Sequence, residues 1–307
     1  MNQVLQVLQT ALPVFVMLGI GVLMRKKNLS TREGVNSLKN VAVNFTLPAV
    51  LFSAFATAQY DLKSIGIPVY MFAVCVLALV LGKVFCRMLG IGGRLSPFLT
   101  TGFEAGMLGY TLFSLLYPKD GASSFAIVDL GQVLFVFTLY KMLLNEGGSR
   151  KELVKEAISS PTIWAIAAGL LLGASGIMKA LEPSGVSELL LSIASFIAAP
   201  TSALILLTIG YDLELKEMLN KSSMKLVALR LSVMAVVLAV TLVLNRFVFG
   251  GAMHTGALIL MMILPPPYVL PVFTNVEEER STVSSALSML TAISLVLFAV
   301  MSALMPR

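Results

Sequence analysis

Apolar runs of about 20 residues recur along the whole length of this chain and are separated only by short polar segments. An α-helix rises about 1.5 Å per residue, so each run is long enough to cross a hydrocarbon layer about 30 Å thick. Only 12% of the 307 residues are charged, whereas a soluble domain carries about 25%. We therefore expect an all-α integral membrane protein without a soluble catalytic domain.

The apolar runs predict ten membrane-spanning helices. The first run lacks the basic region and the cleavage site of a secretory signal, so we expect it to be retained as a span. The expected spans cover residues 4–24, 38–57, 65–86, 95–116, 121–143, 158–180, 186–210, 224–248, 252–275 and 281–304. The chain would then be a multi-pass protein with short loops.

Basic residues are distributed unequally between the two sides of these spans. The odd-numbered loops and their flanks carry sixteen of the 22 Lys and Arg residues, whereas the even-numbered loops and the C-terminus carry five. Because positively charged loops stay in the cytoplasm, both termini are predicted to face outward from the cytoplasmic membrane. The net charge of +6 then follows from topology, and we expect the lipid bilayer as a partner and no nucleic acid.

Short features of the first half recur in the second half at an offset of 148 to 152 residues. They are Pro13 with Gly21, repeated as Pro161 with Gly169, and Pro48 with Tyr60-Asp61-Leu62, repeated as Pro200 with Tyr211-Asp212-Leu213. Each half holds five spans, and this odd number inserts the second copy with opposite orientation. Inverted repeats are typical of secondary transporters. We divide the chain into a first repeat (1–145), a cytoplasmic linker (146–157) and an inverted repeat (158–307).

The ninth span contains three consecutive prolines, Pro265, Pro266 and Pro267. Each proline removes an amide donor and disfavours helical geometry at the residue before it. Carbonyls before the prolines and amides near Tyr268 lose their helical partners, so one end can hold a cation and the other an anion. Irregular backbone at this depth is tolerated where protein or a cavity surrounds it. We expect a broken helix at a binding site, and a proline kink packed against its neighbours is the alternative.

If the halves repeat, the fourth span is interrupted as well. Gly106 and Gly109 lie in its middle, where they lower helix propensity and permit close approach of a second backbone. Glu104 precedes them within the apolar run. The first break is therefore expected to be rich in glycine and to contain an acid, while the second is rich in proline.

Two carboxyl groups are expected inside the membrane, Glu104 in the fourth span and Asp129 in the fifth. A carboxyl at this depth is costly, which makes it a functional candidate. Adjacent antiparallel helices can bring the two together, and Gln132 lies on the same helical face as Asp129. Close carboxyls raise each other's proton affinity and suit a proton relay, or they can hold Na⁺ together with backbone carbonyls. A protonated acid that only stabilises the fold is the third alternative.

The other polar residues give little sign of further chemistry. Arg230 lies one or two turns from the cytoplasmic end of the eighth span, and we expect its side chain to extend to that surface. Cys75 and Cys86 fall within one apolar run, so we expect neither a disulfide nor a metal site. Phosphate-binding, dinucleotide-binding and zinc-binding motifs are absent, and we expect no enzyme activity and no cofactor.

Four segments of the chain resemble the auxin efflux carrier family of bacterial permeases and plant PIN proteins. They are NFTLPAVLF at 44–52, GFEAGMLGYTLF at 102–113, DLGQVLFVFTL at 129–139 and LPPPYVLPVFTNVEEERSTVSSALSMLTAISLVLF at 264–298. The chain lacks the long central loop of plant members, which favours a bacterial permease. The resemblance implies a fold related to the bile acid sodium symporters. Its scaffold consists of the first, second, sixth and seventh spans, and the other six form a transport core.

By the same resemblance, the broken fourth and ninth helices cross and substrate binds beside the crossing. The residues carried over are Glu104, Gly106, Gly109, Asp129, Gln132, Pro265, Pro266, Pro267 and Tyr268. The family usually has Asn where this chain has Glu104, and Pro where it has Thr111. An acid at this position favours proton coupling, or a substrate that is neutral or cationic.

Family substrates are mostly organic anions, so we expect a secondary active transporter of small organic acids that works by alternating access. Glu104 or Asp129 would carry a coupling proton. A sodium-coupled transporter of a neutral or amino-acid-like solute is one alternative, and a non-transporting membrane sensor with the same fold is another. The expected partner is a small molecule, a carboxylate. The oligomeric state is left open and includes a homodimer.

Overall fold

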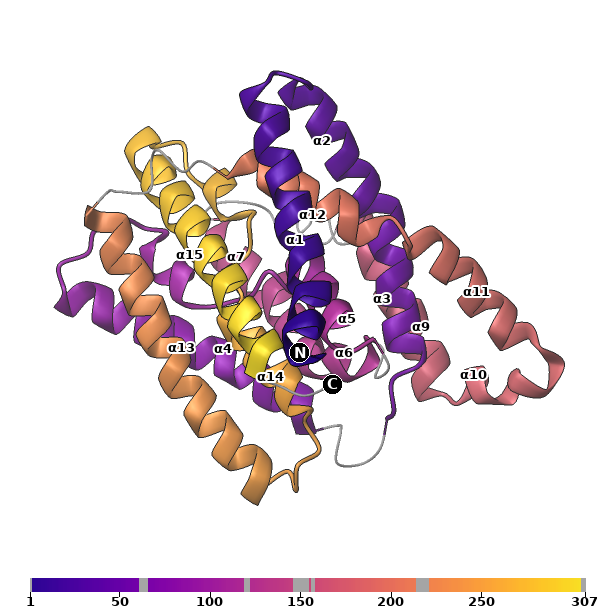
Figure 1. Ribbon diagram of the computed structural model, residues 1–307. Coiled ribbons are helices and arrows are strands. Elements are labelled where there is room, and N and C mark those ends of the chain that lie inside the picture. The colour runs from indigo at the N-terminus through magenta and orange to yellow at the C-terminus, as the bar shows by residue number, and fades with distance from the viewer. Residues whose placement is uncertain are drawn as a thin grey trace.

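The computed structural model describes residues 2–60, 66–118, 122–145, 155, 158–213 and 221–304. These residues form helices and connecting segments and no β-strand (Figure 1). The long helices are α1 (Asn2–Lys26), α2 (Arg32–Val41), α3 (Leu47–Ala56), α4 (Gly66–Met88), α6 (Ser123–Phe135), α9 (Pro161–Ala174), α11 (Val186–Ala198), α12 (Thr201–Asp212), α13 (Lys221–Phe247), α14 (Thr255–Ile263) and α15 (Glu277–Leu304). Asp61, Leu62 and the expected linker, except for Lys155, lie outside the described residues.

Shorter helical segments complete or connect the long helices. They are η1 (Ala42–Thr46), η2 (Ser96–Thr100), η3 (Ala105–Gly109), α5 (Tyr110–Leu116), η4 (Val136–Tyr140), α7 (Lys141–Leu144), α10 (Ile177–Ala180), η5 (Glu182–Ser184) and η6 (Leu270–Phe273). The segments η1, η3 and η4 are π-helical, whereas η2, η5 and η6 are 3₁₀ turns. The run of α2, η1 and α3 therefore forms one continuous helix across residues 32–56.

Six helices of the described chain are long and apolar enough to cross a membrane. They are Arg32–Ala56, Gly66–Met88, Ser123–Leu144, Val186–Asp212, Lys221–Phe247 and Glu277–Leu304. A seventh is obtained if the pair bent by 65° at residues 175–176 forms one span. The prediction of an all-α multi-pass membrane protein is confirmed at this level. The ten-span inverted repeat stays a prediction.

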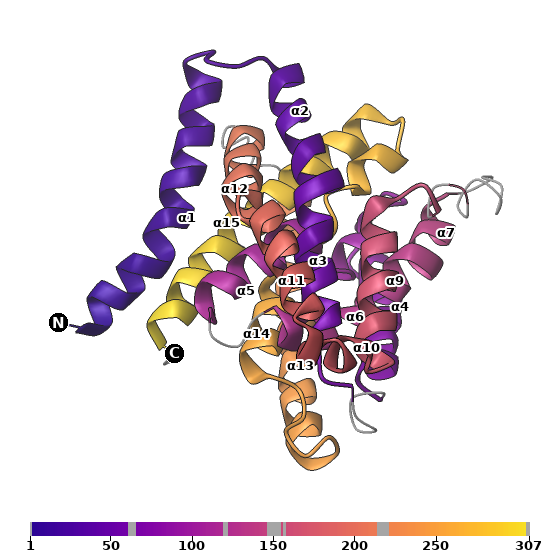
Figure 2. The same cartoon turned by 90° about the vertical axis from the view of Figure 1, so that its right-hand side faces the viewer.

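Helices from the two halves of the chain pack side by side (Figures 1 and 2). Helix α1 lies along α12, and α3 contacts both α9 and α11. A second set of contacts joins α4 with α6 and η2, and joins α13 with α4, α14 and α15. Contacts of α3 with α6 and of α12 with η3 and α5 connect the two sets. The interrupted segment around η3 therefore lies where the two helix groups meet.

Small residues set the distance between α1 and α12. A Cβ atom added to Gly21 would collide with the backbone of Leu207, and one added to Gly210 would collide with the backbone of Leu18. The two glycines therefore let the helix backbones touch, which is a common way to pack helices where lipid offers no hydrophobic driving force. This contact ties the first helix of the chain to the second half.

Candidate functional site

Two helical segments are interrupted close to where the sequence predicts breaks. The first interruption, at residues 101–104, separates η2 from η3, and the second, at 264–269, separates α14 from η6. The Glu104 amide donates to the Pro265 carbonyl over 2.8 Å, which joins the two interruptions directly. The helical piece before the first break is only the 3₁₀ segment Ser96–Thr100, shorter than expected from a span that begins at residue 95.

Gly102 lets the two interruptions approach each other. Its φ of +66° lies in the left-handed region, which residues with a side chain rarely adopt. A Cβ atom at this position would lie 3.0 Å from Cδ of Pro267. Gly102 is the first residue of the segment GFEAGMLGYTLF, but the sequence pattern predicted the break later in the span, at Gly106 and Gly109.

Gly106 and Gly109 do not form the break itself. They belong to the π-helical turn η3, which starts at Ala105 directly after the break. A Cβ atom at Gly109 would lie 2.9 Å from Cδ1 of Leu264, so this glycine makes room for the second interruption. The prediction of a glycine break is therefore wrong by a few residues, because the Glu104 side chain caps the helix and fixes its start before the glycines.

The carboxylate of Glu104 accepts hydrogen bonds from backbone amides at both breaks. One oxygen accepts the Tyr268 amide at 2.7 Å, and the other accepts the Met107 amide at 3.4 Å. Bonds from amides to a carboxylate are stronger than bonds between neutral groups. The predicted free amide near Tyr268 is thus present, but the anion that binds it is a side chain of the protein.

The positively charged side chain of Arg230 lies at the carbonyl groups that precede or begin the two breaks, whereas Glu104 binds amides that come later in each segment. Its guanidinium donates to the carbonyls of Leu99, Thr101, Gly102 and Leu264 at 2.8, 3.4, 2.9 and 2.8 Å. Three of these carbonyls lie at the first break and one at the second. Backbone oxygens that lost their helical partners are therefore satisfied by one side chain, as the low-dielectric surroundings require.

The expectation that Arg230 extends to the membrane surface is wrong. Its side chain is 1% exposed, and its guanidinium lies 5.5 Å from the centre of the Phe103 ring. Helix α13 begins at Lys221, earlier than expected, so Arg230 lies deeper along the helix. The sequence around Arg230 is apolar and does not predict these four carbonyl partners, because they come from distant segments.

Asp129 and Gln132 lie on one face of α6 next to the first break. The Tyr110 hydroxyl donates to Oδ2 of Asp129 at 3.1 Å, and Nε2 of Gln132 donates to the Phe103 carbonyl at 2.8 Å. Oδ1 of Asp129 and Oε1 of Gln132 are buried, and neither has a hydrogen-bond partner in the described part of the chain. Glu104 and Asp129, which the sequence suggested can meet, therefore bind different groups.

A cavity of about 540 Å³ reaches the second break, and we call it the basic cavity. The residues that define it are Arg32 and Lys39 of α2, Asp212 of α12, and Tyr268, Arg280 and Thr291 near the second break. Lys39 and Asp212 form an ion pair of 3.5 Å, and the hydroxyls of Tyr268 and Thr291 are 3.0 Å apart. Among the described residues, the lining thus holds three cationic residues and one acid.

A second cavity of about 360 Å³ lies beside the helix that follows the first break, and we call it the serine cavity. Its polar lining, as far as the described residues form it, consists of hydroxyl side chains, including Ser53, Ser114, Ser195, Tyr110 and Thr111, and contains no charged residue. Arg32 and Ser53 lie towards opposite ends of the helix that spans residues 32–56. The basic and serine cavities therefore lie at opposite ends of the same helices.

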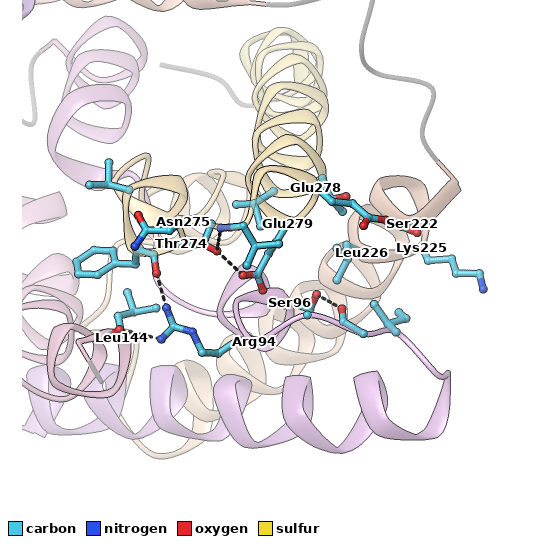
Figure 3. Close-up of a pocket in the computed structure, with 18 of the residues that line it drawn as sticks. Arg94, Ser96, Leu144, Ser222, Lys225, Leu226, Thr274, Asn275, Glu278 and Glu279 are labelled. Atoms are coloured by element: carbon cyan, nitrogen blue, oxygen red, sulfur yellow. Dashed lines mark hydrogen bonds between the residues drawn. The ribbon is translucent and has the colours of Figure 1, made fainter. Parts of the chain in front are cut away.

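A third cavity, of about 960 Å³, is lined by segments that flank the breaks, among them Arg94, Ser96 and residues 272–276, but by no residue of 101–104 or 264–269 (Figure 3). Arg94 at its edge donates to the carbonyls of Leu144 and Phe273. Glu279 accepts the Leu95 amide at 2.8 Å and the Thr274 hydroxyl at 2.7 Å. These charged groups hold loops of the two halves together, which favours a structural role for this region.

The chain is similar to known membrane transporters. Residues 6–154 match the family model described as "Membrane transport protein". An uncharacterized transporter of Methanothermobacter thermautotrophicus is 25% identical over 217 residues, which is 68% of this chain and 68% of that protein. The helical fold and these matches support a membrane transport protein. Within that class, they support the resemblance to the auxin efflux carrier family.

Proposed function

We propose that the protein is a secondary active transporter of small organic acids that works by alternating access. The observation that carries this proposal is the pair of cavities at opposite ends of the same helices. The basic cavity reaches Tyr268 at the second break, and the serine cavity reaches Tyr110 and Thr111 after the first break. A shift of one helix group against the other can close one cavity and open the other.

In this proposal the two helix groups have different roles. Helices α1 to α3 and α9 to α12 form the scaffold, while α4 to α7 and α13 to α15 form the moving core. Ten spans in two inverted repeats, with both termini outside, would place the basic cavity on the cytoplasmic side of the cytoplasmic membrane. The serine cavity would then face outward.

The charge of the basic cavity supports an organic acid as substrate. Arg32 and Lys39 on α2 face the core residue Arg280 across this cavity, and Asp212 neutralises part of the charge by pairing with Lys39. A cleft that is net positive concentrates anions. A small carboxylate that enters here would approach the site residues beside the breaks: Glu104, Gly106, Gly109, Gln132, Pro265, Pro266, Pro267 and Tyr268.

Proton coupling has more support than sodium coupling. The carbonyls of both breaks, which otherwise suit a cation, already bind the Arg230 guanidinium. Glu104 and Asp129 are ionisable groups beside the breaks, and Oδ1 of Asp129 has no hydrogen-bond donor among the described residues. A membrane sensor has no need of two cavities at opposite ends, so we favour transport over that alternative.

Uptake by purified protein in liposomes tests this proposal. A thermal-stabilisation screen of carboxylates selects the substrates, whose accumulation is then measured with and without an imposed pH gradient. Replacing Arg32 and Lys39 by Gln should raise KM for the anion roughly tenfold, which corresponds to about 1.4 kcal/mol. Arg87→Gln, at the exposed end of α4, changes a residue that lines none of the three cavities and should leave KM unchanged. Equal effects of both changes, or no carboxylate uptake by the wild type, would contradict the proposal.

A further inference from the structure

Two buried acceptor atoms beside the first break have no donor within the described part of the chain. They are Oδ1 of Asp129 and Oε1 of Gln132, which lie three residues apart and so on the same face of α6. The Asp129 side chain is 1% exposed, and one hydroxyl, that of Tyr110, donates to its other oxygen. A buried polar atom without a partner costs about 1–3 kcal/mol, and a charged group costs more. A proton on Asp129 removes the charge and supplies the missing donor.

Among the described residues, the Tyr110 hydroxyl is the one group that stabilises the charge of Asp129 by direct contact, and it bonds to Oδ2 alone. Two ionisable side chains act on Asp129 itself, Tyr110 from α5 and Glu104 from the first break. Around them, Cys75 from α4 interacts with Asp129 and with Arg230 from α13, and Tyr60 interacts with Tyr110. The guanidinium of Arg230 is turned towards four carbonyls, and the Glu104 carboxylate adds repulsion. The neighbouring segments Leu47–Ala56 and Thr255–Ile263 contain no ionisable residue.

Glu104 differs from Asp129 in how its oxygens are satisfied. Both of its oxygens accept backbone amides, from Met107 and Tyr268, and its own amide is bonded to the Pro265 carbonyl. The surroundings therefore support the charged form of Glu104 and hold the two breaks together through it. A proton on Glu104 would weaken those contacts.

Tyr110 connects Asp129 to the serine cavity. Its side chain is among those that line this cavity, and its hydroxyl is bonded to Asp129. Neighbouring hydroxyl residues such as Ser114 and Thr111 make the lining polar, although the cavity carries no charged side chain. A proton can thus pass from the cavity to Oδ2 of Asp129 if the Tyr110 hydroxyl gives up its proton and accepts another from the cavity side. A half-turn of the carboxyl group then brings the protonated oxygen to the position of Oδ1, which lacks a donor among the described residues.

We propose that Asp129, with Tyr110 and Gln132, forms the proton-binding site and exchanges its proton with the serine cavity through Tyr110. Glu104 keeps its charge and acts as a positioning residue for the two breaks. This assignment rests on the proposed function for its role in coupling. The proton site itself is a property of the folded protein, and it can be observed without a substrate.

Infrared difference spectroscopy of the purified protein in lipid tests the proton site directly. A change of pH should reveal the carbonyl band of a buried protonated carboxyl, and Asp129→Asn should remove this band. Glu104→Gln should leave it in place. Tyr110→Phe should keep the band but slow its hydrogen–deuterium exchange several-fold. A band that survives Asp129→Asn or disappears in Glu104→Gln would overturn the assignment.

A conservative variant covers the case in which Asp129→Asn does not fold. Asp129→Glu keeps an ionisable group on α6, and it should shift the frequency of the same band. An unshifted band in this variant would also overturn the assignment. Gln132→Glu is a less suitable change, because the Nε2 bond to the Phe103 carbonyl would be lost.

Transport measurements separate this inference from the proposed function. In liposomes, Asp129→Asn should retain exchange of labelled for unlabelled substrate, but lose accumulation that is driven by a pH gradient. Accumulation that persists in Asp129→Asn would show that another group carries the proton. If the wild type exchanges no organic acid while the infrared band behaves as expected, the transport proposal fails and the proton site stands.

Discussion

The two helix breaks solve the same problem with different residues. The first break contains a glycine that permits close approach and an acid that binds amides, Gly102 and Glu104. The second contains three consecutive prolines, which remove donors and contribute no polar side chain of their own. Its amide at Tyr268 and its carbonyl at Leu264 are therefore satisfied from elsewhere, by Glu104 and Arg230. The second break depends on the first, and the two form one unit.

The largest effect is expected where both breaks share a residue. Arg230→Met leaves four buried carbonyls without their donor, and we expect a loss of about 3–5 kcal/mol in the free energy of unfolding. Arg230→Lys should recover only part of this, because an ammonium group cannot reproduce the fork of the guanidinium. Thermal unfolding in lipid–detergent micelles measures both changes.

The matched control for this prediction lies on the same helix. Arg246 is exposed near the end of α13, and Arg246→Met should leave the unfolding temperature nearly unchanged. Wild-type stability in Arg230→Lys would mean that charge alone matters at the crossing. In that case the separate hydrogen bonds from the guanidinium to the four carbonyls would not be needed to hold the two breaks together.

A smaller effect is expected from the contact between the breaks. Gly102→Ala places a Cβ atom 3.0 Å from Pro267 and also meets the left-handed backbone. Gly90→Ala has a similar φ of +60° but no neighbour within 4 Å. The backbone alone costs roughly 1–2 kcal/mol, so Gly102→Ala should destabilise more than Gly90→Ala. Equal unfolding temperatures of the two variants would show that the breaks do not need this close contact.

The smallest effect is expected at the edge of the second break. Tyr268→Phe loses the hydroxyl pair with Thr291 and should cost about 0.5–1.5 kcal/mol. Tyr70→Phe loses a similar pair with Thr241, away from the three cavities, and should cost about as much. Only Tyr268→Phe should change the KM of uptake, because Tyr268 lines the basic cavity. If both variants had the same KM, the Tyr268 hydroxyl would not contact the substrate.

Local sequence patterns predicted the break at 264–269 well, since three prolines exclude a regular helix whatever surrounds them. The same reasoning placed the first break too late, at Gly106 and Gly109. Glycine permits a break without requiring one, and the cap formed by Glu104 decides where the helix starts. The prediction that the broken ends hold opposite charges was chemically sound, but both charges belong to the protein.

The sequence by itself determined a membrane-embedded helical protein, the presence of broken helices and two buried acids, because hydropathy and proline geometry act locally. Tertiary structure alone decided which acid binds the breaks and which is left with an unpartnered oxygen. It also decided that Arg230 turns inward to carbonyls more than 100 residues away in the first half. Such pairings depend on which helix faces meet, and the uniformly apolar faces of membrane helices do not encode this in a readable pattern.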